Sequence, residues 1–300
     1  MSLQSIFAEI PPLADYRPED FTIEPLESFT NRTYRLKNEV ADWVLRVPRQ
    51  DTSAMIDRGS EAYNLQRAID LGLCPPILWL DLSGLCLMPT VKASRNLATA
   101  DQKDKALLDR LVRNLARLHA SEVDFKGRID YPQSLKSCFS LMLTADRARL
   151  ETRVNQALRL GVLAESRSLA PVPSHVDLVC DNILVQGSET IWFIDWEYSA
   201  MASPYWDLAS LCNTLRLDAV QGVELLAAYG DRFKVLDPQW LGAYRFMLQV
   251  LSVCWFHAFA GGCPAAEERF LMHFRLPAGG GHHDLTIELD SAVREQPLSG

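Results

Sequence analysis

The chain has 300 residues, of which 48% are hydrophobic and 23% are charged, and this composition is typical of a globular protein with enough apolar material for a core. The formal net charge of −8 argues against a nucleic-acid binder, which would carry a basic stripe. Seven cysteines without a CxxC pair indicate reduced thiols. The N-terminus lacks a signal-peptide pattern, and no apolar run approaches the roughly 18 residues of a membrane span. We therefore expect a cytoplasmic protein with no membrane insertion and no nucleic-acid partner.

The segment before Pro89 is expected to form strands and one helix. Its β-prone runs and polar turns predict strands and hairpins, and its apolar residues recur at helical spacing once, before a stop signal at Gly72. In chain order these elements are a strand at 21–28, a hairpin at 33–48, a helix at 56–73 and a hairpin at 76–89.

Long helical stripes replace the short strands after Pro89. In the segment 105–120, leucines recur at helical spacing and form one apolar face. Further helices are predicted at 134–161, 206–217, 221–233 and 239–260.

The change of texture predicts a two-lobed α+β protein. Residues 1–88 would form a small β-rich lobe with one helix, and residues 89–275 a larger, mainly helical lobe. The Gly-rich and polar segment 276–300 is expected to be a loosely ordered tail. A ligand site is expected in the cleft between the lobes.

One stretch between the helices, residues 175–199, carries most of the chemistry and reads HVDLVCDNILVQGSETIWFIDWEYS. Its two β-prone runs, NILV and TIWFID, flank a QGSE turn and should pair as a hairpin. Pairing brings Asp177, Asn182 and Asp195 into one oxygen-rich cluster. Such ligands suit Mg²⁺, which takes one or two carboxylates together with substrate phosphates.

The spacing from His175 to Asn182 matches the H-x-D-L-x-x-x-N catalytic loop of kinases position for position. Asp195 then falls where that plan places a second, metal-binding aspartate. A carboxylate that holds no metal can accept the proton of an attacking hydroxyl. An isolated H-x-D could simply cap a turn, but the joint pattern predicts phosphoryl transfer.

The same stretch with its continuation, FIDWEYSAMASPYWDLASL, resembles the choline/ethanolamine kinase and aminoglycoside phosphotransferase superfamily. It is most similar to bacterial choline kinases of the lipopolysaccharide-decorating type, with thiamine kinases close behind. Upstream, FTNRTYRL, WVLRVP and IDRGSEAYN resemble the family's nucleotide loop, following strand and helix, and LARLH recurs before the catalytic loop. The resemblance implies a protein-kinase-like fold and an enzyme that uses ATP and Mg²⁺.

At matching positions, the resemblance implies that Asp177 is the catalytic base and that His175 braces its loop. Asn182 and Asp195 would hold Mg²⁺. Asp207, in PYWDLAS, would support the catalytic loop, and it could equally be a helix N-cap.

The resemblance also implies a nucleotide site. Arg46 would contact the ATP phosphates, since a guanidinium is a bidentate phosphate donor, and Glu61 would hold Arg46 in place. The nucleotide loop lacks the glycines that normally let the backbone approach phosphate, so its side chains would supply donors. The remaining nucleotide contacts would come from Ser28, Thr30, Asn31 and, against the adenine, Met88.

The catalytic residues say little about the acceptor alcohol. Aromatic faces and a carboxylate hold quaternary ammonium groups, and Trp206, Trp255 and Glu197 are the candidates for this role. We therefore expect a kinase of a small, cationic alcohol such as choline or ethanolamine. A thiamine kinase, an aminoglycoside phosphotransferase and a kinase-like binding module without turnover are the alternatives, and the oligomeric state is open.

Overall fold

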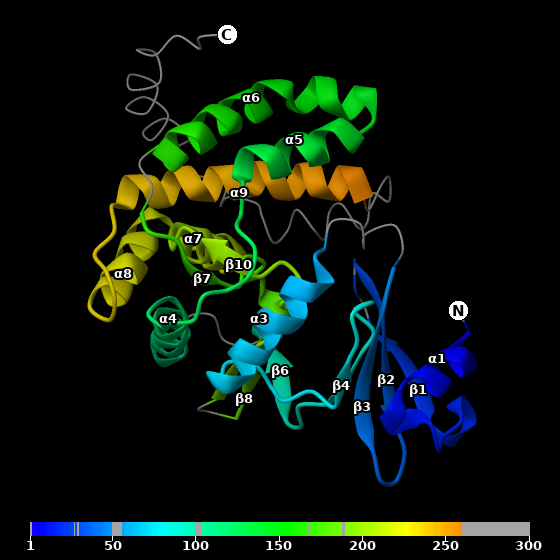
Figure 1. The fold of residues 1–300 in the computed structure, drawn as a ribbon. Helices are drawn as coiled ribbons and strands as arrows, with labels where there is room; N and C mark the ends of the chain where they lie inside the picture. The colour runs from blue at the N-terminus through cyan, green and yellow to red at the C-terminus, as the bar shows by residue number, and fades with distance from the viewer. Residues whose placement is uncertain are drawn as a thin grey trace.

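Figure 1 shows a sheet-rich N-terminal part beside a larger helical part. The computed structural model describes residues 2–259 except 27, 29, 50–55, 100–103, 167–168 and 188–189. The predicted tail at 276–300 lies outside the described residues.

The N-terminal part is built on an antiparallel sheet with the strand order β1-β2-β3-β5-β4. Its strands are β1 (Thr22–Leu26), β2 (Asn31–Lys37), β3 (Asp42–Pro48), β4 (Trp79–Leu80) and β5 (Cys86–Pro89). β2 pairs with β3 from Asn31 opposite Pro48 to Lys37 opposite Asp42, and β4 pairs with β5. The predicted strand and both predicted hairpins are therefore confirmed.

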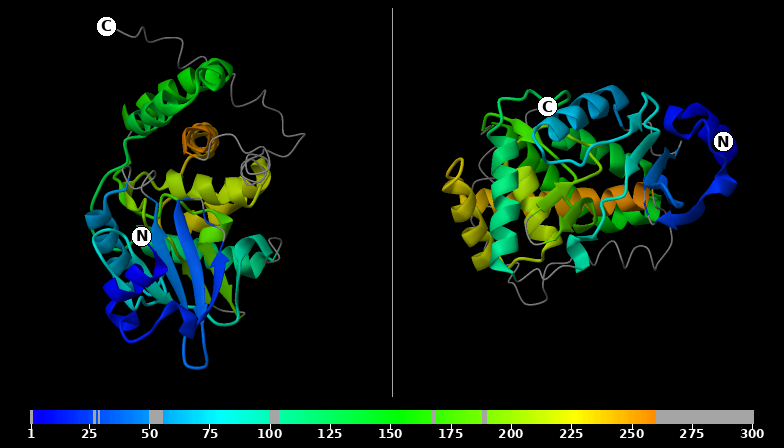
Figure 2. Two further views of the ribbon diagram at one scale, coloured as in Figure 1. Left: turned by 90° about the vertical axis from the view of Figure 1, so that its right-hand side faces the viewer. Right: turned by 90° about the horizontal axis from the view of Figure 1, so that it is seen from below.

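A short helix and two 3₁₀ turns precede the sheet, and the sequence patterns did not predict them. They are α1 (Leu3–Glu9), η1 (Pro11–Leu13) and η2 (Pro18–Asp20). Ile6 and Phe7 of α1 are buried against Leu36, Leu45 and Leu87 of the sheet in a core of their own. Both views in Figure 2 show α1, in dark blue, beside the sheet of the N-terminal part.

Helix α3 (Arg58–Asp70) belongs to the N-terminal half of the sequence but packs on the helical part. Asp57 caps it by accepting hydrogen bonds from the backbone N–H groups of Gly59 and Ser60. The Asn64 amide donates to the carbonyl of Ser199 at 2.8 Å. Leu65 packs in the core of the helical part. These contacts tie the helix to the helical part, although it precedes that part in the sequence.

Among the described residues, two small sheets are formed by the segment that holds the catalytic motif and by the strands that flank it. One has the order β6-β8-β9, and β10 pairs with β7 in another. The elements are β6 (Ser94–Asn96), η3 (Leu97–Thr99), β7 (Val172–Ser174), η4 (Cys180–Asn182), β8 (Ile183–Gln186), β9 (Thr190–Phe193) and β10 (Ala200–Ala202). Ile183 of β8 lies opposite Phe193 of β9, which confirms the predicted hairpin.

The helical part consists of long helices around a second core. They are α4 (Lys105–His119), α5 (Tyr131–Leu141), α6 (Thr144–Ser166), α7 (Tyr205–Thr214), α8 (Ala219–Gly230) and α9 (Pro238–Phe259). The prediction of one continuous helix at 134–161 is wrong. The backbone becomes extended at Met142, so this segment forms two helices, α5 and α6. Helix α9 lies against α5, α6 and α7.

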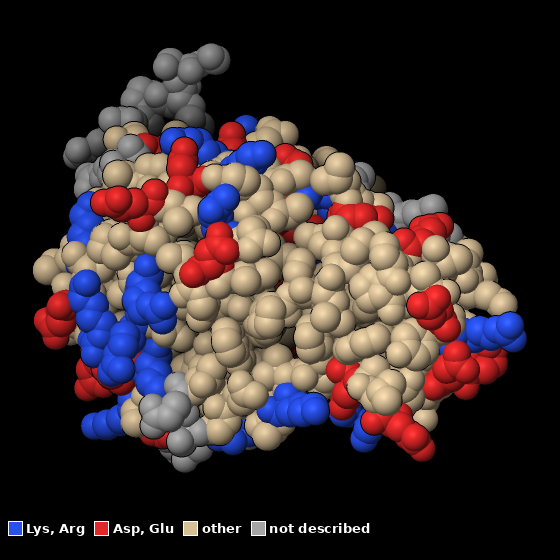
Figure 3. Space-filling model, turned by 60° about the horizontal axis from the view of Figure 1, so that its bottom comes forward, with Lys and Arg blue, Asp and Glu red and all other residues tan. Residues whose placement is uncertain are grey.

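The predicted α+β, protein-kinase-like class is thus confirmed, while the boundaries at residues 88 and 275 stay predictions. In the part of the chain that the structure describes, no helix combines the length and the apolar character that a membrane span requires. On the face drawn in Figure 3, basic side chains gather at the left and acidic side chains are more frequent at the right, and the middle carries little charge of either sign.

Candidate active site

Asp177 and Asn182 lie together at the entrance to the β8–β9 hairpin. The Asn182 amide nitrogen donates to the Asp177 carboxylate at 2.9 Å and to the Asp177 carbonyl at 2.9 Å. Both of its donor contacts therefore fix the loop around Asp177, and the amide oxygen is the side-chain atom left for a cation. The backbone N–H of Ile194 donates to the Asn182 carbonyl, which brings the end of the hairpin back to its start.

Burial and the nearby charge of Glu197 raise the pKa of Asp177 to about 7. Asp177 is the predicted general base, and a general base must be ionised to accept a proton. Turnover should therefore rise as the pH passes through about 7 and level off above it, and bound cations should move the midpoint to lower pH. A profile of kcat/KM from about pH 5.5 to about pH 9 checks this, and a profile that is flat through this range would contradict it.

Asp207 supports the predicted catalytic loop through the backbone of that loop. Its carboxylate accepts hydrogen bonds from the backbone N–H groups of His175 at 2.7 Å and Val176 at 2.8 Å, and it contacts His119 Nε2 at 3.2 Å. Burial acts to raise the pKa of Asp207, but these partners outweigh it and hold the pKa below its usual value. Val176 has a φ of 74°, a strained value for a β-branched residue, so the two backbone contacts stabilise a conformation that the loop would otherwise avoid.

Replacing Asp207 with Asn should destabilise the protein by about 3 kcal/mol, since both carboxylate oxygens face N–H donors and an amide must turn its own donor toward one of them. Chemical denaturation followed by circular dichroism measures the change. Asp231→Asn, on an exposed residue at the end of α8, is the matched control and should be neutral. Equal stability of both variants would remove Asp207 as a support.

His175 is fully buried and burial lowers its pKa, so the ring is neutral. Its Nε2 lies 2.9 Å from the carbonyl oxygen of Ile194 and donates to it, which ties the catalytic loop to the strand end before Asp195. The ring of Trp196 lies 4.6 Å from the His175 ring and completes this support. The predicted bracing role of His175 fits this position.

Asp195 follows the hairpin with a φ of 62°, outside the usual range for a non-glycine residue. Arg46 Nη1 contacts its carboxylate at 3.2 Å. Burial and then Glu197 raise its pKa well above the usual value, with Arg46 acting in the opposite direction. In this buried position beside Glu197, the ionised Asp195 carboxylate would be stabilised by additional positive charge.

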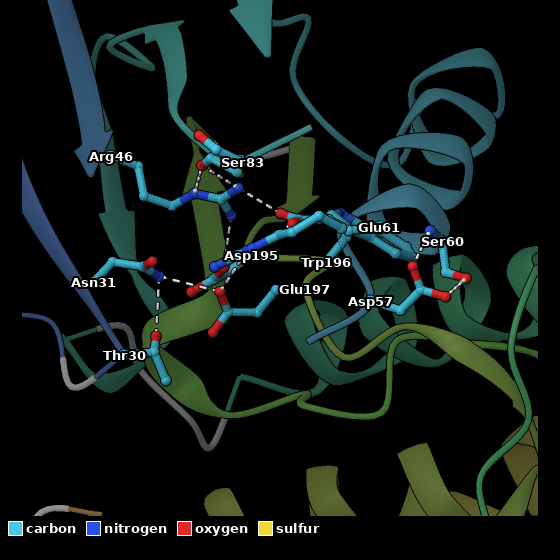
Figure 4. Close-up of polar contacts among 12 residues, drawn as sticks. Thr30, Asn31, Arg46, Asp57, Ser60, Glu61, Ser83, Asp195, Trp196 and Glu197 are labelled. Carbon is cyan, nitrogen blue, oxygen red and sulfur yellow. Dashed lines mark hydrogen bonds and ion pairs between the residues drawn. The ribbon is translucent and has the colours of Figure 1, made fainter. Parts of the chain in front are cut away.

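Arg46 and Glu61 form a buried ion pair, as the sequence predicted (Figure 4). Burial opposes the charge of Arg46, but Glu61 and Asp195 outweigh it and raise the pKa of Arg46. The guanidinium also donates to the carbonyl of Gly84, at 3.1 Å from Nη2. The side chain is therefore fixed between the sheet, helix α3 and the loop after the hairpin.

Side chains of Ser28, Thr30 and Asn31 hydrogen-bond within the segment predicted to be the nucleotide loop. The backbone N–H of Asn31 donates to Ser28 Oγ at 3.3 Å, and the Asn31 amide donates to Thr30 Oγ1 at 2.9 Å. The same amide donates to the Glu197 carboxylate at 3.2 Å, as Figure 4 shows. These three residues thus form a small network that reaches Glu197, in the loop after the β8–β9 hairpin, and their predicted contacts with ATP stay predictions. Met88 lies half-buried in β5, opposite Val44.

The three predicted acceptor residues occupy different places. Trp206 is buried behind the catalytic loop, where its indole N–H donates to the Val176 carbonyl at 2.8 Å. Glu197 is buried and paired with residues of the N-terminal part. Trp255 is half-buried near the end of α9 and hydrogen-bonds to Tyr198. The pKa of Tyr198 is raised well above its usual value by burial and by the charges of Glu197 and Asp177.

Sequence reasoning did not single out several residues of the site: Arg58, His119, Trp196 and Tyr198. Arg58 stands at the start of a helix, where a charged residue is usually solvated. Trp196 and Tyr198 are part of the quoted DWEYS motif, so their place in the sequence was the available signal. His119 ends the quoted LARLH run, but its partner Asp207 is 88 residues away.

The donor set fits a magnesium ion that also binds phosphate. Among the described residues, no three His, Cys, Asp or Glu side chains gather closely enough to hold a metal ion alone. Mg²⁺ requires less than this, since one or two carboxylates, an amide oxygen and substrate phosphates suffice. Asp195 and Asn182 can supply the protein's share.

A strand-rich lobe, a helical lobe and an Asp–Asn–Asp constellation beside a buried Arg–Glu pair define a kinase with a protein-kinase-like fold. The chain belongs to the phosphotransferase enzyme family, whose sequence pattern matches residues 22–244. It is accordingly an enzyme that transfers a phosphoryl group to a small molecule. The predicted superfamily is confirmed, and the alternative of a binding module without turnover is set aside.

Known relatives agree with this assignment. Protein LicA of Haemophilus influenzae is 26% identical over 261 residues, which cover 80% of this chain and 76% of that protein. The crystal structure of choline kinase LicA from Streptococcus pneumoniae superposes with a TM-score of 0.72 at 22% identity, over 91% of this chain and 92% of the other. A crystal structure of LicA in complex with AMP has a TM-score of 0.76 at 21% identity, over 91% and 98% of the two chains. These structures share the fold of this chain.

Proposed function

We propose that this enzyme transfers the γ-phosphoryl group of ATP to the hydroxyl of a small cationic alcohol, choline or ethanolamine, with the help of Mg²⁺. The observation that carries the proposal is the cluster of Asp177, Asn182 and Asp195 facing the buried Arg46. The similarity to choline kinase LicA and to LicA bound to AMP supports the acceptor and the nucleotide. A nucleotide-dependent enzyme of this kind fits the cytoplasmic location expected from the sequence.

Each side chain of the cluster has a defined task in the reaction, and Asn182 has two. Asp177 accepts the proton of the acceptor hydroxyl as its oxygen attacks, and Asn182 holds the Asp177 carboxylate in place. Arg46 neutralises charge on the ATP phosphates, and Glu61 keeps its guanidinium aligned. Bound magnesium, held by Asn182 and Asp195, would neutralise the charge of the transferring phosphoryl group.

The acceptor site lies in this proposal beside Tyr198 and Trp255, at the end of α9. The indole face attracts a quaternary ammonium group, and Asp177 and Glu197 add negative charge nearby. Thiamine is also a cationic alcohol, whereas an aminoglycoside with several ammonium groups would need a more acidic pocket.

Trp255→Leu should raise the KM for choline about 10- to 30-fold and leave the affinity for ATP unchanged, because a cation–π contact is lost at the acceptor end of the site. Steady-state kinetics at saturating ATP measure this. Trp240→Leu is the matched control on the same helix, about 22 Å from Trp255 along its axis. An unchanged KM for choline in Trp255→Leu would move the acceptor site elsewhere.

An ADP-release screen over choline, ethanolamine, thiamine, homoserine and several aminoglycosides tests the proposal. Choline or ethanolamine should accelerate ADP release by the wild-type enzyme above its rate with ATP alone. Acceleration by thiamine or an aminoglycoside instead would overturn the acceptor assignment and keep the phosphotransferase chemistry.

A further inference from the structure

Arg58, the first residue of α3, is a second buried arginine beside the active site and has no role in the mechanism above. Only 9% of it is exposed. Its Nη1 lies 2.6 Å from Glu61 and 3.4 Å from Glu197. A single nitrogen therefore contacts the partner of Arg46 and a carboxylate two residues beyond Asp195.

These contacts extend the Arg46–Glu61 pair into a continuous chain of charges. The order is Asp195, Arg46, Glu61, Arg58 and Glu197, with opposite signs in contact at every step. The chain begins and ends on the loop after the hairpin and passes through the sheet and α3. Without Arg58, three carboxylates would share the one remaining guanidinium in a mostly desolvated site.

Burying the Arg58 guanidinium costs free energy of folding. Its Nε and Nη2 are buried and have no hydrogen-bond partner among the described residues. The turn between β4 and β5 leaves room for it through Gly84, which has a φ of 87°. A Cβ at Gly84 would lie 2.5 Å from Cζ and Nε of Arg58. The turn is thus shaped around this guanidinium.

We propose that Arg58 is a positioning residue for phosphoryl transfer. It holds Glu61 against Arg46 and holds Glu197 beside the loop that carries Asp195, so that the phosphate-binding arginine and the metal-binding carboxylate keep a fixed relation across the two lobes. This inference rests on the proposed function in two respects, the use of ATP as the phosphoryl donor and the binding of magnesium by Asp195.

The first test replaces the charge. Arg58→Met should lower kcat/KM for ATP about 30-fold, and Arg58→Lys should recover much of it, because one nitrogen makes both contacts. In a Glu197→Gln background, Arg58→Met should cost clearly less, since one of its two partners is already neutral. Arg67→Met, on the same helix with its exposed partner Asp70, is the matched control and should match wild type. Full additivity, or no gain with Lys over Met, would overturn the proposal.

The second test displaces the guanidinium without changing any charge. Gly84→Ala forces Arg58 to move, whereas Gly72→Ala introduces a Cβ at a similar φ of 65° with nothing within 4 Å. Both variants carry comparable backbone strain. Only Gly84→Ala should lower kcat/KM for ATP, and equal losses in the two variants would contradict the role of Arg58.

Calorimetric affinity for ATP, measured without acceptor on all these variants, separates this inference from the proposed function. If wild type binds ATP but phosphorylates none of the tested alcohols, the acceptor assignment fails and the affinities still test Arg58. Weaker ATP binding in Arg58→Met and Gly84→Ala than in their controls supports the positioning role. Wild-type affinity in both variants overturns it.

Discussion

Replacing Asp177 with Asn should lower kcat about 10³-fold and leave the affinity for ATP nearly unchanged. The amide has the shape of the carboxylate but cannot accept the proton of the acceptor hydroxyl. Asn182 would keep a partner at this position through the amide oxygen, so the loop should hold its shape. Single-turnover kinetics measure the chemical step, and calorimetry measures ATP binding.

Asp181→Asn is the matched control for this variant, because it makes the same change on an exposed residue of the same loop. It should retain wild-type turnover. If Asp177→Asn turns over as fast as Asp181→Asn, Asp177 is not the base and the assignment of the catalytic loop fails.

Replacing Asp195 with Asn should have an effect of similar size through a different cause. The variant loses the negative charge that a magnesium ion would require, so we expect kcat to fall at least about 10²-fold and the Mg²⁺ concentration for half-maximal turnover to rise. Arg46 keeps its pair with Glu61, so the nucleotide site should stay intact.

A magnesium titration of turnover, together with manganese binding measured by electron paramagnetic resonance in the presence of ATP, checks the second prediction. Asp181→Asn again serves as the control. Wild-type manganese affinity in Asp195→Asn would show that the metal is held elsewhere.

Local signals explain what could be predicted from the sequence. The hairpin at 183–193 follows from two β-prone runs around a Gly-containing turn, and the end of α3 follows from Gly72. The grouping of Asp177, Asn182 and Asp195 is a consequence of that hairpin. Spacing within one continuous stretch therefore fixed the centre of the candidate site.

Contacts between distant segments explain what could not be predicted. Nothing in the residues around Arg58 indicates that Glu197, 139 positions later, will lie beside it. The break between α5 and α6 at Met142 contains no proline or glycine, so the helical periodicity of the sequence predicted one helix across it. Trp206 has the chemistry of an aromatic ligand contact, but its indole N–H is committed to the Val176 carbonyl, a partner that only the fold reveals.

The most direct test of the account is phosphorus NMR of a reaction that contains ATP, Mg²⁺ and choline. Wild-type enzyme should convert the γ-phosphate signal into the phosphomonoester signal of phosphocholine, with one ADP formed per product, while Asp177→Asn forms neither at a comparable rate. The appearance of inorganic phosphate without a phosphomonoester, or of equal product with Asp177→Asn, would contradict the proposed transfer.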